Sequence, residues 1–121
     1  MIITSCYPAL FTKDVEKTVA ELKELGFMIL YKRTSMIEAN KRVYVMQRAD
    51  GVKTEVVGSD LVPSETHIPH IEIKDFDEGL SMHRKNGYTM IKGPLMANTN
   101  KAALIKSPDG FMILLVQHLA I

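Results

Sequence analysis

Apolar residues recur along two stretches of the chain at the spacing of an amphipathic helix. One stretch follows Asp14 and the other follows Asp75. An aspartate at such a point can accept a hydrogen bond from the free amides of the first turn, so each one marks a helix start. Gly26 and Gly87 then supply the left-handed residue that ends a helix. The pattern therefore predicts two helices, each bounded by an aspartate and a glycine.

Short apolar runs with strand-like alternation lie before and after these helices. The predicted strands cover residues 7–12, 27–31, 42–47 and 52–57 in the first half, and 68–73, 88–91, 102–106 and 111–117 in the second. An Asp-Gly pair at residues 50–51 is typical of a hairpin turn. Each half therefore has the predicted order β-α-β-β-β.

The two halves also repeat in sequence. Asp14 and Gly26 recur 61 residues later as an aspartate and a glycine, and the 50–51 pair recurs 59 residues later. A unit of about 60 residues is marginal alone, so the two are expected to share one core. We predict an α+β fold, with tandem βαβββ units at 1–60 and 66–121 in a single domain covering 1–121. The units would form a curled mixed sheet around a cleft, with the helices on its outer face. A ferredoxin-like sandwich is a weaker alternative.

Alternation along strand 68–73 predicts which side chains face the helix. Its odd-numbered residues are all apolar and are expected to pack against the helix, whereas Ile68, His70 and Glu72 point the other way. In strand 7–12 the equivalent side carries Tyr7 and Phe11. Because ligands bind in clefts, we expect these side chains to line a shared small-molecule pocket.

Composition narrows the range of partners. The formal net charge is +1, which argues against a nucleic-acid-binding surface. No apolar run approaches the roughly 18 residues that span a bilayer, so no membrane partner is expected. Cys6 is the single cysteine and has no partner for an intrachain disulfide, which favours a cytoplasmic location; we expect its thiol to be buried and inert.

Two segments carry a family resemblance. Residues 8–17 read Pro-Ala-Leu-Phe-Thr-Lys-Asp-Val-Glu-Lys, and residues 107–111 read Ser-Pro-Asp-Gly-Phe. With the doubled βαβββ pattern, they make nearly the whole chain resemble the vicinal oxygen chelate superfamily. That superfamily includes glyoxalase I, extradiol dioxygenases, and fosfomycin- and bleomycin-resistance proteins. The resemblance also implies a homodimer.

The resemblance implies four metal-ligand positions, which fall on Tyr7, Glu55, Ile68 and Leu114. Isoleucine and leucine offer no lone pair, and a neutral tyrosine is a poor ligand. One carboxylate alone cannot hold a divalent cation. We therefore expect no metal and no cofactor.

Our first hypothesis is a metal-free small-molecule-binding protein, one that sequesters a drug or metabolite as the bleomycin-resistance proteins do. The expected ligand-binding residues are Tyr7, Phe11, Glu55, Ile68, His70, Glu72, Met112 and Leu114.

A second hypothesis is a glyoxalase-like lyase or isomerase with a non-standard site. His70 and Glu72 would be its catalytic candidates, together with Glu55. A third hypothesis is a regulatory module whose pocket has diverged from that of its relatives. Against the enzyme, His70 could simply be a wall residue bonded to a carboxylate, and Glu55 could form a salt bridge with a basic residue. Whether the protein is an enzyme is left open.

Overall fold

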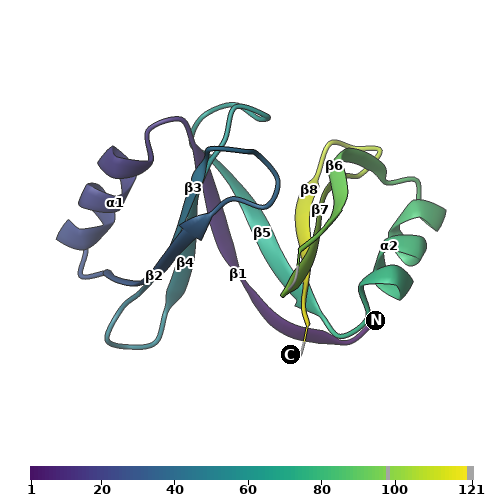
Figure 1. Cartoon of the computed structure of the whole chain (residues 1–121), viewed down its shortest axis with the longest axis horizontal. Helices are drawn as coiled ribbons and strands as arrows, with labels where there is room; N and C mark the ends of the chain where they lie inside the picture. Colours follow the sequence, from purple (N-terminus) through teal and green to yellow (C-terminus); the bar gives the residue numbers. More distant parts are fainter. Residues whose placement is uncertain (98, 120–121) are drawn as a thin grey trace. The chain divides into compact units, whose positions relative to one another are not determined.

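A computed structural model of the chain describes residues 1–97 and 99–119, which form two compact units. The first, here the N-unit, is Tyr7–Ile68. The second, the C-unit, combines Met1–Cys6 with the described residues from Pro69 onward. Within the described residues there are two helices and eight strands, which confirms the predicted α+β class and the doubled βαβββ order (Figure 1).

The N-unit holds the first helix and a four-stranded mixed sheet. Its elements are β1 (Ile3–Thr12) from Tyr7 onward, α1 (Val15–Glu24), β2 (Met28–Thr34), β3 (Arg42–Gln47) and β4 (Lys53–Gly58). The strand order is β2-β3-β4-β1. β1 runs parallel to β4, and the other neighbours are antiparallel. The parallel pair follows from the helix that crosses over after β1.

The C-unit repeats this arrangement with the second helix. Its elements are β5 (Thr66–Ile73), α2 (Phe76–Lys85), β6 (Thr89–Met96), β7 (Asn100–Lys106) and β8 (Met112–His118), in the order β5-β8-β7-β6. The start of the chain also belongs here, because the Lys74 amide donates to the Ile2 carbonyl at 3.0 Å. The Thr4 hydroxyl likewise donates to the Glu72 carbonyl at 3.3 Å.

Both helices begin and end as predicted. The Asp14 carboxylate accepts a hydrogen bond from the Lys17 amide, and the Asp75 carboxylate accepts one from the Glu78 amide, each at 3.1 Å. After α1 the chain turns at a glycine with φ +92°, and after α2 at one with φ +84°. Such positive values strain any residue with a side chain, which explains glycine at both places.

Each helix packs on one face of its own sheet. In the C-unit, Phe76 and Leu80 of α2 join a core with Ile73, Ile105 and Leu115. In the N-unit, Val19 packs with three buried side chains of β3 and β4: Tyr44, Met46 and Val56. Alternation therefore turns the even-numbered residues of β5 away from α2, as predicted. This leaves the opposite sheet faces for the polar residues described below.

Some details differ from the sequence expectations. β6 extends to Met96 rather than ending at residue 91, and its pairing with β7 shifts register around Gly93. Cys6 is exposed, so the prediction of a buried thiol is wrong. It lies in the part of β1 that belongs to the C-unit. No helix among the described residues is long and apolar enough to cross a membrane.

The cap of α2 gives a testable consequence. Asp75→Ala should lower the free energy of unfolding by about 1 kcal/mol, because the Glu78 amide loses its acceptor. Asp77→Ala is the matched control, since that exposed carboxylate makes only a surface contact with Lys101 at 3.4 Å. Urea unfolding followed by circular dichroism measures both. Equal losses in the two variants would contradict the capping role.

Candidate functional site

The sheet face of the N-unit that points away from α1 gathers several of the predicted site residues. In the parallel register of β1 and β4, Ala9 lies opposite Glu55, so Tyr7 and Phe11 flank that position on the same face. Tyr7, Phe11 and Glu55 are all buried, with Glu55 at 0% exposure. A carboxylate this deeply buried needs a charge partner, because leaving it unpaired in a low-dielectric interior is costly.

Arg33 of β2 provides that partner. Its Nη2 lies 3.2 Å from Glu55 Oε2, and its side chain is 27% exposed. The strand registers explain why these two side chains lie close together. Arg33 lies opposite Val43, and Val43 lies opposite Val57. Val57 is two residues from Glu55 on the same strand, so Arg33 and Glu55 point to the same face of the sheet. A salt bridge between Glu55 and a basic residue was one of the alternatives considered from the sequence. The structure contains it, and the basic residue is Arg33.

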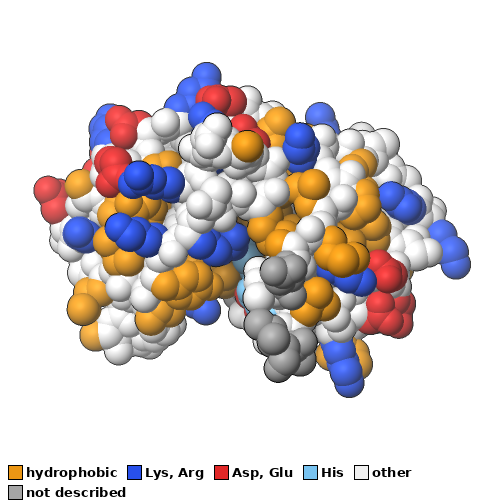
Figure 2. Space-filling model, viewed as in Figure 1, with side chains coloured by type: hydrophobic (Ala, Val, Ile, Leu, Met, Phe, Trp, Pro, Cys, Tyr) orange, Lys and Arg blue, Asp and Glu red, His pale blue; other side chains and the backbone are white. Residues whose placement is uncertain are grey.

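The same arginine borders a groove at the edge of the N-unit. The groove has a volume of about 240 Å³ and is lined by Lys32, Arg33, Thr34 and Arg42. Three of these four residues are cationic and none is acidic. Figure 2 shows basic side chains among apolar ones over this part of the surface. The groove therefore has the charge expected of a site for an anion.

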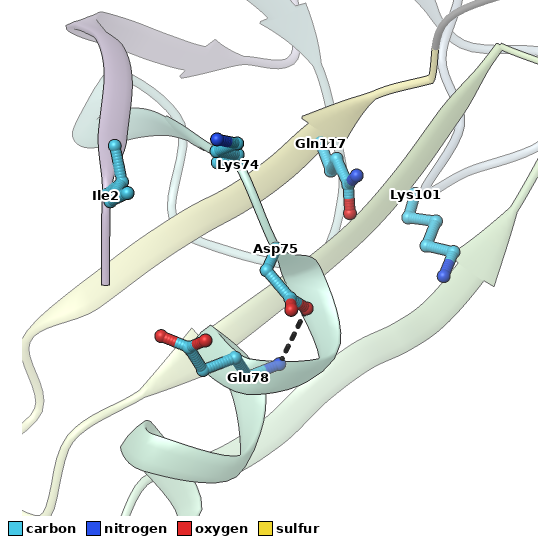
Figure 3. Close-up of a pocket in the computed structure, with 6 residues that line it drawn as sticks. All are labelled: Ile2, Lys74, Asp75, Glu78, Lys101 and Gln117. Carbon is cyan, nitrogen blue, oxygen red and sulfur yellow. Dashed lines mark hydrogen bonds between the residues drawn. The ribbon is translucent and has the colours of Figure 1, made fainter.

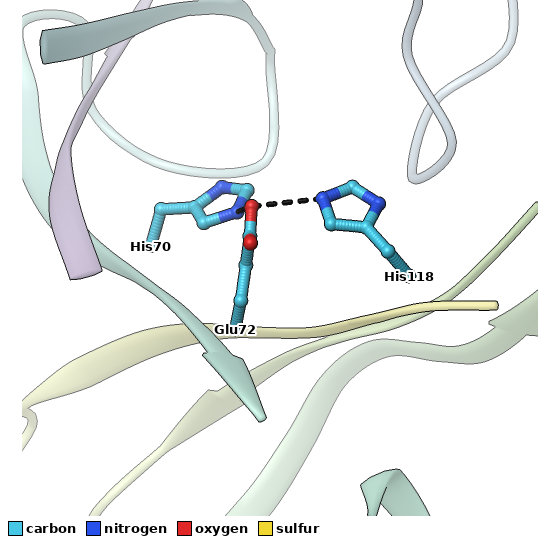
Figure 4. A group of neighbouring side chains, drawn as sticks. All are labelled: His70, Glu72 and His118. Atoms are coloured by element: carbon cyan, nitrogen blue, oxygen red, sulfur yellow. Dashed lines mark hydrogen bonds and ion pairs between the residues drawn. The ribbon is translucent and has the colours of Figure 1, made fainter. Parts of the chain in front are cut away.

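In the C-unit, the face turned away from α2 carries a histidine–carboxylate cluster (Figure 4). The Nε2 atoms of His70 and His118 lie 3.1 Å and 2.8 Å from the same oxygen, Oε1 of Glu72. His70 is fully buried, whereas 47% of the His118 side chain is exposed. The cluster thus reaches from the interior of the sheet to its surface.

His118 was not among the predicted site residues, although a signal for it exists. In the parallel register of β5 and β8, His70 lies opposite Leu114 and Glu72 opposite Val116. One more alternation step along β8 reaches His118 on the same face. The sequence gives the alternation, but it does not show that β8 is the neighbour of β5.

The cluster holds Glu72 in its ionised form. The hydrogen bond from His70, followed by that from His118 and the charge of both rings, lowers the pKa of Glu72 from 4.5 to about 2. On the other side of the ring, Nδ1 of His118 contacts Oδ1 of Asn100. Glu72 is therefore a carboxylate at any ordinary pH and can serve as an anion, a base or a ligand.

The four positions implied for the superfamily's metal do not fit a metal ion here. Ile68 and Leu114 are buried hydrocarbon side chains with no donor atom. Glu55 already pairs with Arg33. Of the remaining predicted residues, Phe11 is fully buried and Met112 is half-buried at the start of β8. Whether the N-unit and C-unit residues line one pocket stays a prediction.

A second hollow, of about 520 Å³, lies at the start of α2 (Figure 3). Its polar groups serve the helix itself. Gln117 Oε1 accepts a hydrogen bond from the Phe76 amide at 2.9 Å, and Asp75 accepts one from the Glu78 amide. Because these amides of the first turn are already satisfied, we assign this hollow a structural role in capping α2.

The lowered pKa of Glu72 predicts a pH dependence of stability. The unfolded chain takes up a proton near pH 4.5, whereas the folded protein resists it down to about pH 2, so protonation favours unfolding. The stabilisation is therefore complete above pH 4.5 and is lost as pH falls towards 2.

Urea unfolding at a series of pH values measures this loss. Glu72→Gln should lose less stability than wild type across that window. Glu21→Gln, which removes an exposed carboxylate from α1, should follow the wild-type curve. Parallel curves for wild type and Glu72→Gln would show that the cluster does not hold the charge.

Comparison with known proteins supports the fold. No family model and no curated protein matches the chain. Glyoxalase I from Zea mays superposes with a TM-score of 0.71 at 16% identity, over 99% of this chain and 45% of its own. Methylmalonyl-CoA epimerase from Mycobacterium tuberculosis gives a TM-score of 0.69 at 11% identity, over 98% and 91%.

A third solved structure is a glyoxalase/bleomycin resistance protein/dioxygenase superfamily member from Vibrio splendidus 12B01. It matches with a TM-score of 0.64 at 17% identity, over 93% of this chain and 97% of its own. Identities this low speak for architecture and not for activity. Together with the two βαβββ units, these similarities show that the chain has the vicinal oxygen chelate fold.

Proposed function

We propose that the protein binds a small anionic molecule, a carboxylate or phosphate, in the groove beside Arg33. It would do so without a metal ion at the four positions implied for the superfamily. The observation that carries the proposal is the Arg33–Glu55 ion pair, in which an implied ligand position holds a guanidinium 3.2 Å away. We expect the arginine, and not a metal ion, to hold the anion.

Arginine suits this role because its guanidinium is planar and presents five donors in a fixed fork. The Glu55 carboxylate holds it from the buried side, through Nη2. The side chain is 27% exposed, and Arg33 is one of the four residues that line the groove. A carboxylate or phosphate can accept two such bonds at once, which gives both affinity and orientation.

The groove's other cations support an anion over a cation as ligand. Lys32 and Arg42 line it with Arg33, and no acidic residue is among the lining residues. Arg42 is held only loosely, since its Nη1 lies 3.9 Å from Glu16 and both side chains are 68% exposed. The attraction is local, because the formal net charge of the whole chain is only +1.

Binding is tested by titrating the purified protein with succinate and with inorganic phosphate, using calorimetry. The uncharged succinamide is the control ligand. Arg33→Gln should weaken succinate binding by about 10- to 100-fold, the loss expected for a charge-assisted pair. Arg48→Gln removes an arginine from the same unit, where it pairs with Asp50 at the surface, and should bind like wild type. Equal affinity in wild type and Arg33→Gln would refute the proposal.

The ion pair also predicts a pattern of stabilities. Arg33→Met should cost about 1–3 kcal/mol, since the buried Glu55 loses a partner while the guanidinium itself is part exposed. Adding Glu55→Gln to that variant should recover part of the loss, because a neutral amide is cheaper to bury than a charge. Chemical unfolding of the two single variants and the double variant measures the coupling. Additive effects would mean that the pair is not an energetic unit.

A lyase or isomerase is the second candidate function. The His70–Glu72–His118 cluster favours it, because a carboxylate between two imidazoles can move a proton. Proton exchange at the carbon next to a ligand carbonyl, followed in deuterated water, distinguishes the two. Exchange that Glu72→Gln abolishes would favour the enzyme, and its absence would favour binding alone.

The expected homodimer and cytoplasmic location belong to this proposal as well. Light scattering of the purified protein measures its mass directly, and a value of 13.6 kDa would exclude the dimer under those conditions.

A further inference from the structure

Three side chains of the C-unit direct their donor atoms at one point. Figure 4 shows His70 and His118 on either side of Glu72, with both rings turned towards its carboxylate. One ligand atom from each residue lies within 4.8 Å of the other two. Two nitrogens and one oxygen around a tetrahedral zinc ion, each about 2.1 Å from it, would be separated by about 3.4 Å. The observed nitrogen–oxygen separations of 3.1 Å and 2.8 Å are close to that value. The whole set spans up to 4.8 Å, so an ion would draw the two imidazole nitrogens towards one another.

The surroundings of His118 fix the orientation of its ring. Each nitrogen of this ring faces an oxygen, since Nδ1 contacts Asn100 Oδ1 and Nε2 lies 2.8 Å from Glu72 Oε1. The amide of Asn100 is oriented by its own Nδ2, which donates to Thr99 Oγ1 at 3.1 Å. Nε2 is therefore the nitrogen held towards the Glu72 carboxylate.

The Asn100 contact also matches what metal-binding histidines need. A ligating imidazole commonly donates its other N–H to a carbonyl or carboxylate, which fixes the ring and its tautomer. Asn100 does this for His118, while β5 and β8 hold the three ligands on one rigid sheet. His118 is exposed and Glu72 is half-buried, so one side of the cluster is open to solvent. A fourth ligand, such as water or a small molecule, could enter from there.

We propose that His70, Glu72 and His118 form a binding site for a divalent transition metal ion such as Zn²⁺. Two imidazoles and a carboxylate are the donor set that borderline metals of this class prefer. The site differs from the four positions implied by the superfamily resemblance. It lies two residues further along β5 than Ile68 and four further along β8 than Leu114. It is also independent of the Arg33 groove, which belongs to the N-unit.

Calorimetry of the full-length protein, first stripped with a chelator and then titrated with Zn²⁺, tests the site. We expect one equivalent to bind. His118→Gln and Glu72→Gln should each lower the affinity by at least about 10-fold. His67→Gln is the matched control, because that exposed histidine lies on the same strand but outside the cluster. Arg33→Gln should leave Zn²⁺ binding unchanged, which separates this inference from the proposed function.

Ring ¹⁵N chemical shifts provide a second readout that does not depend on the stability of the variants. Added Zn²⁺ should shift Nε2 of His70 and His118 and leave the His67 ring unchanged. No saturable binding would overturn the proposal. An equal loss of affinity in His67→Gln and His118→Gln would also overturn it, since the ion would then be bound adventitiously by surface histidines.

Discussion

The buried carboxylate of Glu55 is the constraint on which this structure's chemistry depends. A charge with 0% exposure must be compensated inside the protein, and Arg33 compensates it at 3.2 Å. This pairing decides two things at once. It engages Glu55, one of the implied ligand positions, and it holds Arg33, which lines a groove together with two further cationic residues. The proposed anion-binding function follows from that fixed charge.

The two units satisfy the same constraint with different residues. At equivalent register pairs, the N-unit has Ala9 beside Glu55, whereas the C-unit has His70 beside Leu114. The polar residue of the pair is therefore on the fourth strand in the N-unit and on the first strand in the C-unit. In the C-unit the carboxylate is Glu72, and its partners are imidazoles instead of a guanidinium. A repeated fold has therefore produced two chemically different sites.

Much of the architecture could be predicted from periodicity. The helix starts at Asp14 and Asp75 and the glycine ends follow from local hydrogen bonding, which a single sequence displays. The faces of β5 follow from alternation. Both signals are local, so they do not depend on which distant segments become neighbours.

The partners within each site could not be predicted, because they depend on which strands become neighbours. Arg33 reaches Glu55 across β3, and His118 reaches Glu72 because β8 lies beside β5. The spacing of residues along the chain predicts neither arrangement. The extended β6 and the exposed Cys6 were missed for a related reason, since strand pairing decides where each segment ends and what covers it.

The replacement of a metal by an arginine–glutamate pair at Glu55 is open to a structural test. The test is a crystal structure grown with both succinate and Zn²⁺. We expect a succinate carboxylate on the Arg33 guanidinium, with Glu55 still paired to that arginine and no ion coordinated by Glu55. A zinc ion coordinated by Glu55, with Arg33 displaced, would contradict it.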